Sequence, residues 1–324
     1  MRLSALFCSL ALAALAAQAA DAPKPTAPKP PAKNNNDQPT YLTAETAGPD
    51  FPLQGEYAAD GLGADVIALG NGNFRVVVFK GGLPGAGWDG SPKTEAEAKR
   101  DGDTVTFKDV AELKGGVLTI GKTTLKRVER HSPTEGAKAP AGAIVLLNGA
   151  NADAWNDGHL DERKLLAAGT TSKQAFQSFA MHLEFLLPFK PLGRGQGRAN
   201  SGVYVQNRYE VQVLDSFGLK GLDNECGGIY QQSAPKVNMC FPPLQWQTYD
   251  IEFTAAKFDA EGKKTADAVL TVKHNGIVVQ DRLALKRPTP GGGFKAEVPA
   301  PGPIQLQGHG NPVFYRNIWV VESK

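Results

Sequence analysis

The chain has 324 residues, and its 35 lysines and arginines nearly balance 33 aspartates and glutamates. This near-neutral charge argues against the basic surface that nucleic-acid binding requires. The length exceeds what one hydrophobic core usually organises, so we expect two domains.

The first twenty residues have the pattern of a secretory signal peptide. An arginine at position 2 precedes an apolar stretch over residues 3–17, and Ala17-Gln18-Ala19 has the small residues of a cleavage site. The stretch is shorter than the ~20 apolar residues of a membrane-spanning helix, and no comparable stretch follows. The sequence therefore predicts a signal peptide over 1–20 and an exported protein, periplasmic or extracellular, without a transmembrane segment.

Two segments have the composition of linkers. Residues 21–40 are mostly Pro, Lys, Ala and Asn, which bury too little apolar surface to offset the entropy of ordering them. We therefore expect a disordered linker over 21–48. Residues 133–142 repeat this Pro, Gly, Ala and Lys composition and predict a second linker.

Between the linkers, residues 49–132 read as a small β domain. Asp65–Leu69 and Phe74–Phe79 flank the sequence Gly-Asn-Gly-Asn, which is typical of a hairpin turn. A phosphate-binding loop is the alternative reading of these glycines, but no helical pattern follows them. Nothing in this domain points to a particular chemistry, and its role stays open.

Residues 143–324 also have the pattern of strands. Apolar residues alternate with polar ones over 179–185 and over 248–253, as they do in half-buried strands. His274-Asn275-Gly276 separates two further apolar runs and predicts another hairpin. Many strands with frequent turns and no crossover helices predict an all-β, antiparallel sandwich or barrel.

The run from Asn200 to Asp215 predicts a hairpin whose register follows from its pattern. Apolar residues fall on odd positions, and opposed residues in an antiparallel pair share a face. A three-residue loop, 206–208, places Val205 opposite Tyr209 and keeps the two faces separate. A two-residue loop would mix them, so the three-residue loop is predicted.

The other face of this hairpin carries Tyr204, Glu210 and Gln212 side by side. An aromatic ring next to carboxyl and amide groups suits a sugar, because the ring stacks while the polar groups hold hydroxyls. The alternative is a solvated sheet face, which more often carries Lys, Thr and Ser. A β-bulge after Gln212 would bring Asp215 onto the same face and give the two carboxylates of glycosidic chemistry. Without a bulge Asp215 only ends the strand.

Four runs in this half of the chain resemble the 3-keto-disaccharide hydrolase domain family. They are NSGVYVQNRYEVQVLDSFG at 200–218, ECGGIYQQSAPKVN at 225–238, WQTYDIEFTAAKFDAEGKKTADA at 246–268 and GPIQLQGHGNPVFYRNIWV at 302–320. The resemblance covers roughly residues 143–324. It implies a concanavalin A-like (jelly-roll) sandwich that acts on glycosides oxidised at C3, after a small N-terminal β domain that it does not cover.

The resemblance also extends to the acidic strand motif of glycoside hydrolase family 16, Glu-x-Asp-x-x-Glu. Here the motif stands as Glu210-x-Gln212-x-x-Asp215, and this departure puts a double-displacement mechanism in doubt. A ketone at C3 acidifies the C2 hydrogen, so a base can remove it and the C1 substituent can leave by elimination. Water added to the unsaturated sugar then completes a net hydrolysis.

The predicted catalytic groups are Glu210 or Asp215 as the base, with His309 as the acid or the group that stabilises the enolate. His309 can equally serve to order its own loop. The predicted substrate contacts are Tyr204, Gln212, Arg208, Tyr230, Gln231, Arg316 and Asn200.

Other features leave alternatives open. Cys226 and Cys240 form either a disulfide or two buried thiols. Glu210, Asp215 and His309 can also hold a divalent cation, and oxygen ligands favour calcium, magnesium or manganese. The expected partners are a carbohydrate substrate and an oxidoreductase that supplies the keto-sugar. A non-catalytic lectin-like module and a structural envelope protein are the alternative functions.

Overall fold

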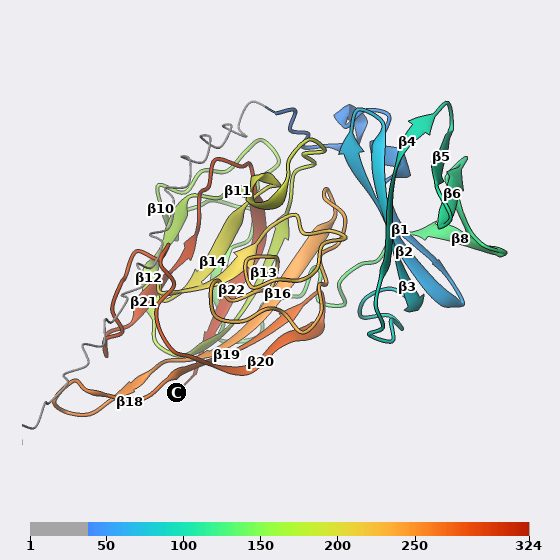
Figure 1. Cartoon of the computed structure of the whole chain (residues 1–324). Coiled ribbons are helices and arrows are strands. Elements are labelled where there is room, and N and C mark those ends of the chain that lie inside the picture. The colour runs from blue at the N-terminus through green and yellow to red at the C-terminus, as the bar shows by residue number, and fades with distance from the viewer. Residues whose placement is uncertain (1–37, 324) are drawn as a thin grey trace, which may run out of the picture. The chain divides into compact units, whose positions relative to one another are not determined.

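The computed structural model describes residues 38–323, and its regular secondary structure is almost entirely antiparallel β-strands (Figure 1). The predicted signal peptide and most of the first linker lie outside the described residues. Over residues 38–323, no helix is both long enough and apolar enough to cross a membrane.

The first eight strands form a closed barrel in sequence order. Turns join neighbouring strands, and β8 returns to pair with β1. The strands are β1 (Gly55–Ala59), β2 (Gly61–Gly70), β3 (Asn73–Gly81), β4 (Thr94–Asp101), β5 (Thr104–Phe107), β6 (Ala111–Lys114), β7 (Val117–Ile120) and β8 (Thr123–Val128).

The predicted hairpin of the N-terminal domain is present as β2 and β3. Asn71 and Gly72 form its turn with φ of 55° and 73°, the left-handed conformation that Asn and Gly adopt most readily. Alternate residues of the long strands point into the barrel, so their apolar side chains form its core. The barrel is uneven, because β4 pairs with β3 over Asn73–Val78 but with β5 only at Arg100 and Asp101.

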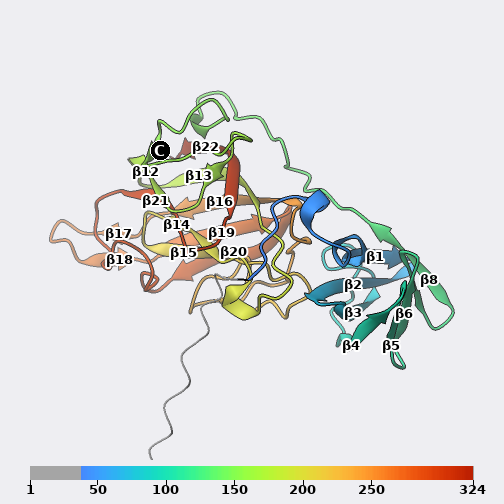
Figure 2. The same cartoon turned by 90° about the horizontal axis from the view of Figure 1, so that it is seen from above.

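The rest of the chain folds into two large sheets and one small hairpin. The five-stranded sheet has the order β10-β12-β21-β14-β15, and the seven-stranded sheet has the order β11-β22-β13-β16-β19-β20, with β9 also paired to β22. Figure 2 shows the hairpin β17–β18 extending beyond the ends of the neighbouring strands. The strands are β9 (Ile144–Leu147), β10 (Trp155–Asn156), β11 (Leu166–Ala167), β12 (Thr170–Phe176), β13 (Phe179–Leu186), β14 (Ser201–Val205), β15 (Tyr209–Val213), β16 (Trp246–Thr254), β17 (Lys257–Phe258), β18 (Lys264–Ala266), β19 (Ala268–His274), β20 (Ile277–Leu285), β21 (Gly302–Leu306) and β22 (Phe314–Glu322).

The two large sheets enclose a common apolar core. Val203, Val205 and Val211 contribute from the five-stranded sheet, and Leu183 and Phe185 contribute from the seven-stranded sheet. Each such side chain stabilises the fold by roughly 1.5–3 kcal/mol when it leaves water. The fold is therefore a β-sandwich of the predicted all-β class.

Three short 3-10 helices complete the described structure: η2 (Ala44–Thr46), η3 (Phe51–Leu53) and η4 (Gly195–Gly197). The helix η2 lies inside the predicted linker over 21–48, so the C-terminal part of that prediction is corrected. Residues 38–48 are ordered, because Tyr41 and Phe189 exchange two backbone hydrogen bonds of 2.9 Å and their rings lie 5.9 Å apart. One aromatic side chain thus fixes a segment whose average composition predicts disorder.

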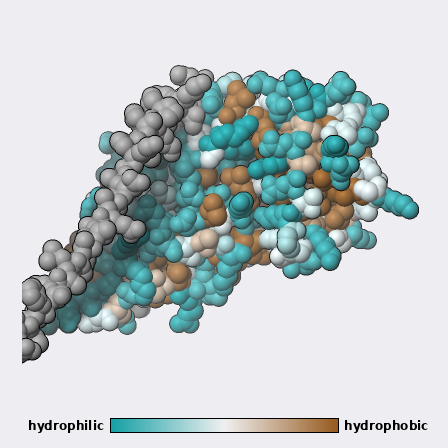
Figure 3. Space-filling model, in the orientation of Figure 1, coloured by the Kyte–Doolittle hydropathy of each residue, from teal (hydrophilic) through white to brown (hydrophobic). Residues whose placement is uncertain are grey.

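Hydrophilic residues cover most of the face seen in Figure 3, and hydrophobic residues lie in patches between them. The predicted hairpin after position 274 is also present, with Asn275 and Gly276 joining β19 to β20.

Candidate active site

A pocket of about 480 Å³ lies over β14 and β15, on the face of the five-stranded sheet that points away from the core. Its lining is almost wholly polar, with five amide side chains, two tyrosines, one carboxyl and one imidazole. The lining residues are Gln196, Asn200, Tyr204, Glu210, Gln212, Tyr230, Gln231, Pro290, Gly291, Gln307 and His309.

The predicted hairpin register places the central residues. Val205 opposes Tyr209, and Tyr204 opposes Glu210, around a loop in which Gln206 and Asn207 both have positive φ. The apolar residues of the hairpin consequently enter the core, while the polar face carries the pocket. The predicted three-residue loop is confirmed.

Tyr204 and Glu210 form a hydrogen-bonded pair in the pocket. The Tyr204 hydroxyl donates to Glu210 Oε2 at 2.7 Å, and Gln307 Nε2 donates to the same hydroxyl oxygen at 3.3 Å. Glu210 is only 4% exposed and Tyr204 is fully buried. The carboxyl therefore has a fixed position and little contact with water.

Burial raises the pKa of Glu210 to about 7, although the hydrogen bond from Tyr204 acts in the opposite direction. Burial and the neighbouring carboxylate raise the pKa of Tyr204 far above its usual value, so its hydroxyl stays protonated. A carboxyl whose pKa lies near neutral pH suits a general base, because it is both partly ionised and sufficiently basic.

Two glycines make room for this pair. A Cβ atom on Gly202 would lie 2.3 Å from Glu210 Oε1, and one on Gly291 would lie 2.3 Å from the Tyr204 hydroxyl oxygen. Both distances are far below van der Waals contact. The sequence therefore needs glycine at these two positions to let the backbone approach the polar pair.

Two loop segments hold the edge of β15 that β14 leaves open. The segment 227–230 pairs with it through Gln212 N–H to Gly228 O at 2.9 Å, and this places Tyr230 and Gln231 at the pocket. Nearby on the same edge, Thr289 Oγ1 accepts from the backbone N–H of Glu210 at 3.1 Å. The chain after Thr289 then supplies Pro290 and Gly291.

A cluster of amide side chains forms one wall of the pocket. Gln196 Oε1 accepts from Asn200 Nδ2 at 2.9 Å and from Gln212 Nε2 at 3.0 Å. Gln196 Nε2 in turn donates to the backbone oxygen of Asn224 at 2.7 Å. These contacts fix the three amides relative to one another.

The structure brings together seven of the ten predicted site residues. Those lining the pocket are Asn200, Tyr204, Glu210, Gln212, Tyr230, Gln231 and His309. His309 is exposed at the rim, whereas Glu210 lies at the base of the polar face. Asp215, Arg208 and Arg316 do not line the pocket, and each of them has another role.

Asp215 is a correction to the sequence-based prediction. The bulge that would turn it toward Glu210 is absent from the β14–β15 pairing, and β15 ends at Val213. Asp215 Oδ2 instead accepts from Arg198 at 2.7 and 3.2 Å, and both side chains are buried. The Arg198 guanidinium and the Asp215 carboxylate neutralise each other in the interior, and this pairing fixes the orientation of Asp215.

Arg208 is a second correction. It lies in the hairpin loop, where it donates to the backbone oxygens of Ala296 at 2.9 Å and Ala300 at 3.4 Å and stacks over Phe294. Its side chain is 2% exposed. Arg208 thus fixes the long connection between β20 and β21 rather than contacting the pocket.

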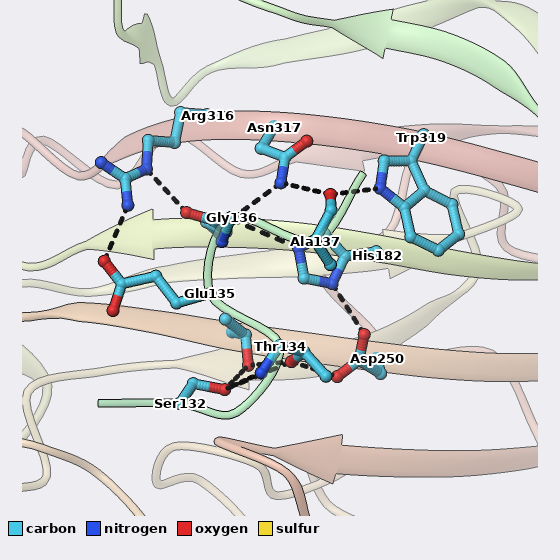
Figure 4. A network of polar contacts seen from close by, with 12 residues as sticks. Ser132, Thr134, Glu135, Gly136, Ala137, His182, Asp250, Arg316, Asn317 and Trp319 are labelled. Carbon is cyan, nitrogen blue, oxygen red and sulfur yellow. Dashed lines mark hydrogen bonds and ion pairs between the residues drawn. The ribbon is translucent and has the colours of Figure 1, made fainter. Parts of the chain in front are cut away.

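Arg316 is a third correction, because it belongs to the other sheet. It lies on β22 and donates to Glu184 Oε2 at 2.6 Å and to Glu135 Oε1 at 2.9 Å (Figure 4). Its guanidinium also lies 3.7 Å from the centre of the Trp246 ring. These contacts bind the second predicted linker to the seven-stranded sheet.

Figure 4 shows the linker running across this sheet, where its backbone and side chains meet a buried polar cluster. Glu184 Oε1 accepts from the backbone N–H of Gly136 at 2.6 Å, and Thr134 Oγ1 donates to Asp250 Oδ2 at 2.7 Å. His182 lies between the two carboxylates, 2.7 Å from Asp250 and 3.4 Å from Glu184. The linker is therefore a loop, but one with fixed contacts.

Cys226 and Cys240 are buried free thiols in this structure, so the second of the two predicted alternatives is present and the disulfide is not. Cys226 Sγ lies 3.1 Å from the Tyr249 hydroxyl, and Cys240 Sγ lies 3.5 Å from the Leu214 oxygen. Burial beside Cys226 raises the pKa of Cys240, so this thiol stays protonated.

No group of three or more His, Cys, Asp or Glu side chains able to hold a metal ion occurs within residues 38–323. The predicted set of Glu210, Asp215 and His309 is not assembled, because Asp215 faces Arg198. The pocket itself contributes one carboxyl and several amide oxygens.

Sequence reasoning missed Gln196, Gln307, Pro290 and Gly291 as lining residues. Gln307 flanks His309 in the chain, so its closeness to the site could have been inferred. The run Pro290 to Gly293 carries a glycine signal for close backbone approach, but nothing in the sequence shows that it crosses the hairpin.

Comparisons with known proteins bear on the family and the fold of residues 142–321. The 3-keto-alpha-glucoside-1,2-lyase-like domain matches residues 142–321. A solved structure of a presumed glycosyl hydrolase from Parabacteroides distasonis ATCC 8503 is 34% identical, with a TM-score of 0.53 over 57% of this chain and 85% of that one.

Two further presumed glycosyl hydrolases from the same organism match more weakly. They are 15% and 21% identical, with TM-scores of 0.40 and 0.39, and cover 56% and 55% of this chain and 94% and 98% of their own. None of the curated proteins matches the chain.

The sandwich and its polar pocket thus define a carbohydrate-active protein of the glycosyl hydrolase kind. The chain belongs to the 3-keto-alpha-glucoside-1,2-lyase-like family, through residues 142–321.

Proposed function

We propose that this protein cleaves the glycosidic bond of 3-keto-glycosides by elimination, followed by addition of water. The observation that carries the proposal is the buried Glu210 carboxyl in the pocket, with its pKa raised to about 7. Membership of the family supports the substrate class.

The number of carboxyl groups favours elimination over direct hydrolysis. Glycosidases that hydrolyse unoxidised sugars use two carboxyl groups on opposite sides of the bond. Among the described residues that line this pocket, Glu210 is the only carboxyl, since Asp215 is paired with Arg198. An elimination needs a single base, and the pocket provides one.

In the first step the Glu210 carboxylate removes the proton from C2. The electron pair of the C2–H bond passes to the C3 carbonyl and gives an enolate. The enolate then forms the C1–C2 double bond and expels the C1 oxygen, which takes a proton as it leaves. Water adds at C1, a proton returns to C2, and the products are the 3-keto-sugar and the free alcohol.

The other pocket residues have roles that follow from their hydrogen-bonding groups. The enolate oxygen needs donors, and Gln307 Nε2 and the Tyr230 hydroxyl lie on the lining. Tyr204 holds Glu210 in place through its 2.7 Å hydrogen bond. His309 at the exposed rim is the group that we assign to protonate the departing oxygen.

The chemistry also defines the surroundings of the protein. An oxidoreductase has to supply the 3-keto group, because the ordinary glycoside lacks an acidic C2 hydrogen. The signal-like N-terminal sequence supports export, so the proposed site of this reaction is outside the cytoplasm, in the periplasm or the medium.

The direct test is turnover of matched 3-keto-glucosides and their unoxidised parents by the wild type and by Glu210→Gln. We expect cleavage of the keto forms alone and a loss of about 10²–10⁴-fold in the variant, the usual contribution of a general base. In deuterated water the sugar recovered after partial reaction should carry deuterium at C2.

Cleavage of the unoxidised parents would contradict the elimination mechanism. If the wild type binds these sugars but turns none of them over, the enzyme proposal fails and a lectin-like module is the better description.

A further inference from the structure

The amide cluster of the pocket has two carbonyl oxygens without a hydrogen-bond partner among the described residues. They are Asn200 Oδ1 and Gln212 Oε1, and their side chains are only 4% and 2% exposed. Leaving a buried acceptor unpaired is unfavourable, so such groups in a pocket indicate a missing donor.

The orientation of these amides follows from the backbone. The Asn224 oxygen can only accept, so Gln196 must turn its Nε2 toward it, at 2.7 Å. Gln196 Oε1 then faces the other two side chains and must receive N–H groups from Asn200 and Gln212. The hydrogen-bond network therefore fixes the orientation of both amides and leaves their carbonyl oxygens unpaired.

We infer that Asn200 and Gln212 bind sugar hydroxyl groups that donate hydrogen bonds, and that they thereby orient the substrate with its keto oxygen toward other, hydrogen-bond-donating groups of the pocket. This inference rests on the proposed function, because it names the part of the substrate that the same pocket recognises. A keto oxygen has no hydrogen to donate, so it cannot satisfy either acceptor.

The lining offers both kinds of hydrogen-bonding group. Asn200 and Gln212 offer acceptors, whereas Gln307 Nε2 and the Tyr230 hydroxyl offer donors. The keto oxygen at C3 therefore faces those donors, and hydroxyls elsewhere on the ring reach the two acceptors. Both unpaired oxygens are covered by neighbouring atoms although their side chains line the pocket, so a hydroxyl reaches them once these side chains move.

A divalent cation is the other ligand that amide oxygens hold, and the charge of the site disfavours it. Calcium sites combine amide oxygens with several carboxylates. This pocket has a single carboxyl, and burial raises its pKa to about 7. Sugar hydroxyls, which are neutral donors, match the two acceptors better.

The test replaces single hydroxyls of the sugar by fluorine, which keeps the size but removes the hydrogen. Methyl 3-keto-glucoside and its 4-fluoro and 6-fluoro analogues are compared, because C4 and C6 lie away from the reacting C2 atom. Binding is measured by ligand-observed NMR with Glu210→Gln, alone and combined with Gln212→Met or Asn200→Leu. Each added substitution preserves shape and removes one acceptor, together with one N–H group that donates to Gln196 Oε1.

We expect fluorine at C4 or C6 to weaken binding about tenfold in the Glu210→Gln background, the usual worth of one hydrogen bond. The same fluorine should leave the binding affinity almost unchanged once the amide that faces it is replaced. Gln305→Met is the matched control, since Gln305 also has an unpaired oxygen but does not line the pocket. It should keep the full fluorine effect.

Three results would overturn the inference. One is a fluorine effect on binding that is equal in Glu210→Gln and in the variants that also lack Asn200 or Gln212. Another is that fluorine does not change binding by Glu210→Gln, or that this variant binds no sugar at all. The third is tight calcium binding that is lost in Gln212→Met. Binding with the expected fluorine pattern but without turnover by the wild type would instead reject the proposed reaction and leave this inference intact.

Discussion

The protonation of Glu210 ties the chemistry of the pocket to the stability of the fold. Its pKa in the folded state is about 7, above the usual value of 4.5. A carboxyl whose pKa is raised by folding stabilises the folded state below its unfolded pKa, and this contribution is lost as the pH rises through about 7. Ionisation of Glu210 therefore lowers the free energy of unfolding by at most about 3 kcal/mol.

We predict that Glu210→Gln is more stable relative to the wild type at pH 8 than at pH 5, by up to about 3 kcal/mol. The glutamine keeps an acceptor for Tyr204 and has no proton to lose. Urea unfolding of both proteins at the two pH values measures the difference. A stability difference that is the same at both would show that Glu210 has an ordinary pKa.

Asp215 has the opposite role to Glu210, although the two lie only a few residues apart. It neutralises Arg198 through contacts of 2.7 and 3.2 Å in a fully buried pair. Removing one partner of such a pair leaves a buried charge without compensation. Asp215 therefore stabilises the chain beneath the pocket.

We expect Asp215→Asn to lower the free energy of unfolding by about 3–5 kcal/mol, as measured by urea unfolding. The double replacement Arg198→Met with Asp215→Leu should be less destabilising than Asp215→Asn alone, because it removes both charges. Folded Asp215→Asn should keep its rate constant within about tenfold of the wild type. A loss as large as that of a general base, about 10²-fold or more, would restore Asp215 to the catalytic set.

At the scale of elements, the contact between the second linker and the seven-stranded sheet depends on the protonation of a histidine. Burial acts to lower the pKa of His182, but hydrogen bonds and charges from Asp250 and Glu184 outweigh it and raise the pKa. A histidine with a raised pKa stabilises the fold fully below its unfolded pKa of 6.5 and loses this effect as the pH rises through the folded pKa. Glu184, with its pKa lowered to about 2, stays ionised throughout.

We predict that the backbone amides of residues 133–137 exchange faster with deuterium at alkaline pH than near pH 6, after correction for the intrinsic rate. Hydrogen-exchange mass spectrometry measures this, with peptides from β19 as the internal reference. In His182→Asn the extra pH dependence should disappear. Equal protection of the linker at both pH values in the wild type would contradict the role of His182.

At the scale of the whole molecule, the sequence predicts those features that depend on near neighbours. The hairpin register from Val203 to Val211 follows from alternation alone, and the turns at Asn71 and Asn275 follow from their glycine neighbours. These features place Tyr204, Glu210 and Gln212 on one face before any coordinates are known.

The remaining site features depend on segments that are distant in the chain. Gln307 reaches Tyr204 across 103 positions, and Glu184 meets Arg316 across 132. Tertiary packing determines which arginine pairs with which carboxylate. The positions of Arg316 and Asp215 therefore could not be predicted from a local pattern. The same limit applies to Tyr41, whose pairing with Phe189 orders a segment of linker-like composition.

The uneven pairing of β4 affects the tendency of the protein to aggregate. Within residues 38–323, one side of Thr94–Lys99 has no strand beside it, since β5 joins β4 only at the last two residues of β4. Open strand edges of this kind invite pairing between molecules and, eventually, aggregation. Here the exposed positions carry Glu95, Glu97 and Lys99, and two such edges paired parallel and in register would place like charges opposite one another. The strand thus protects itself by its charges, where a neighbouring strand would otherwise cover it.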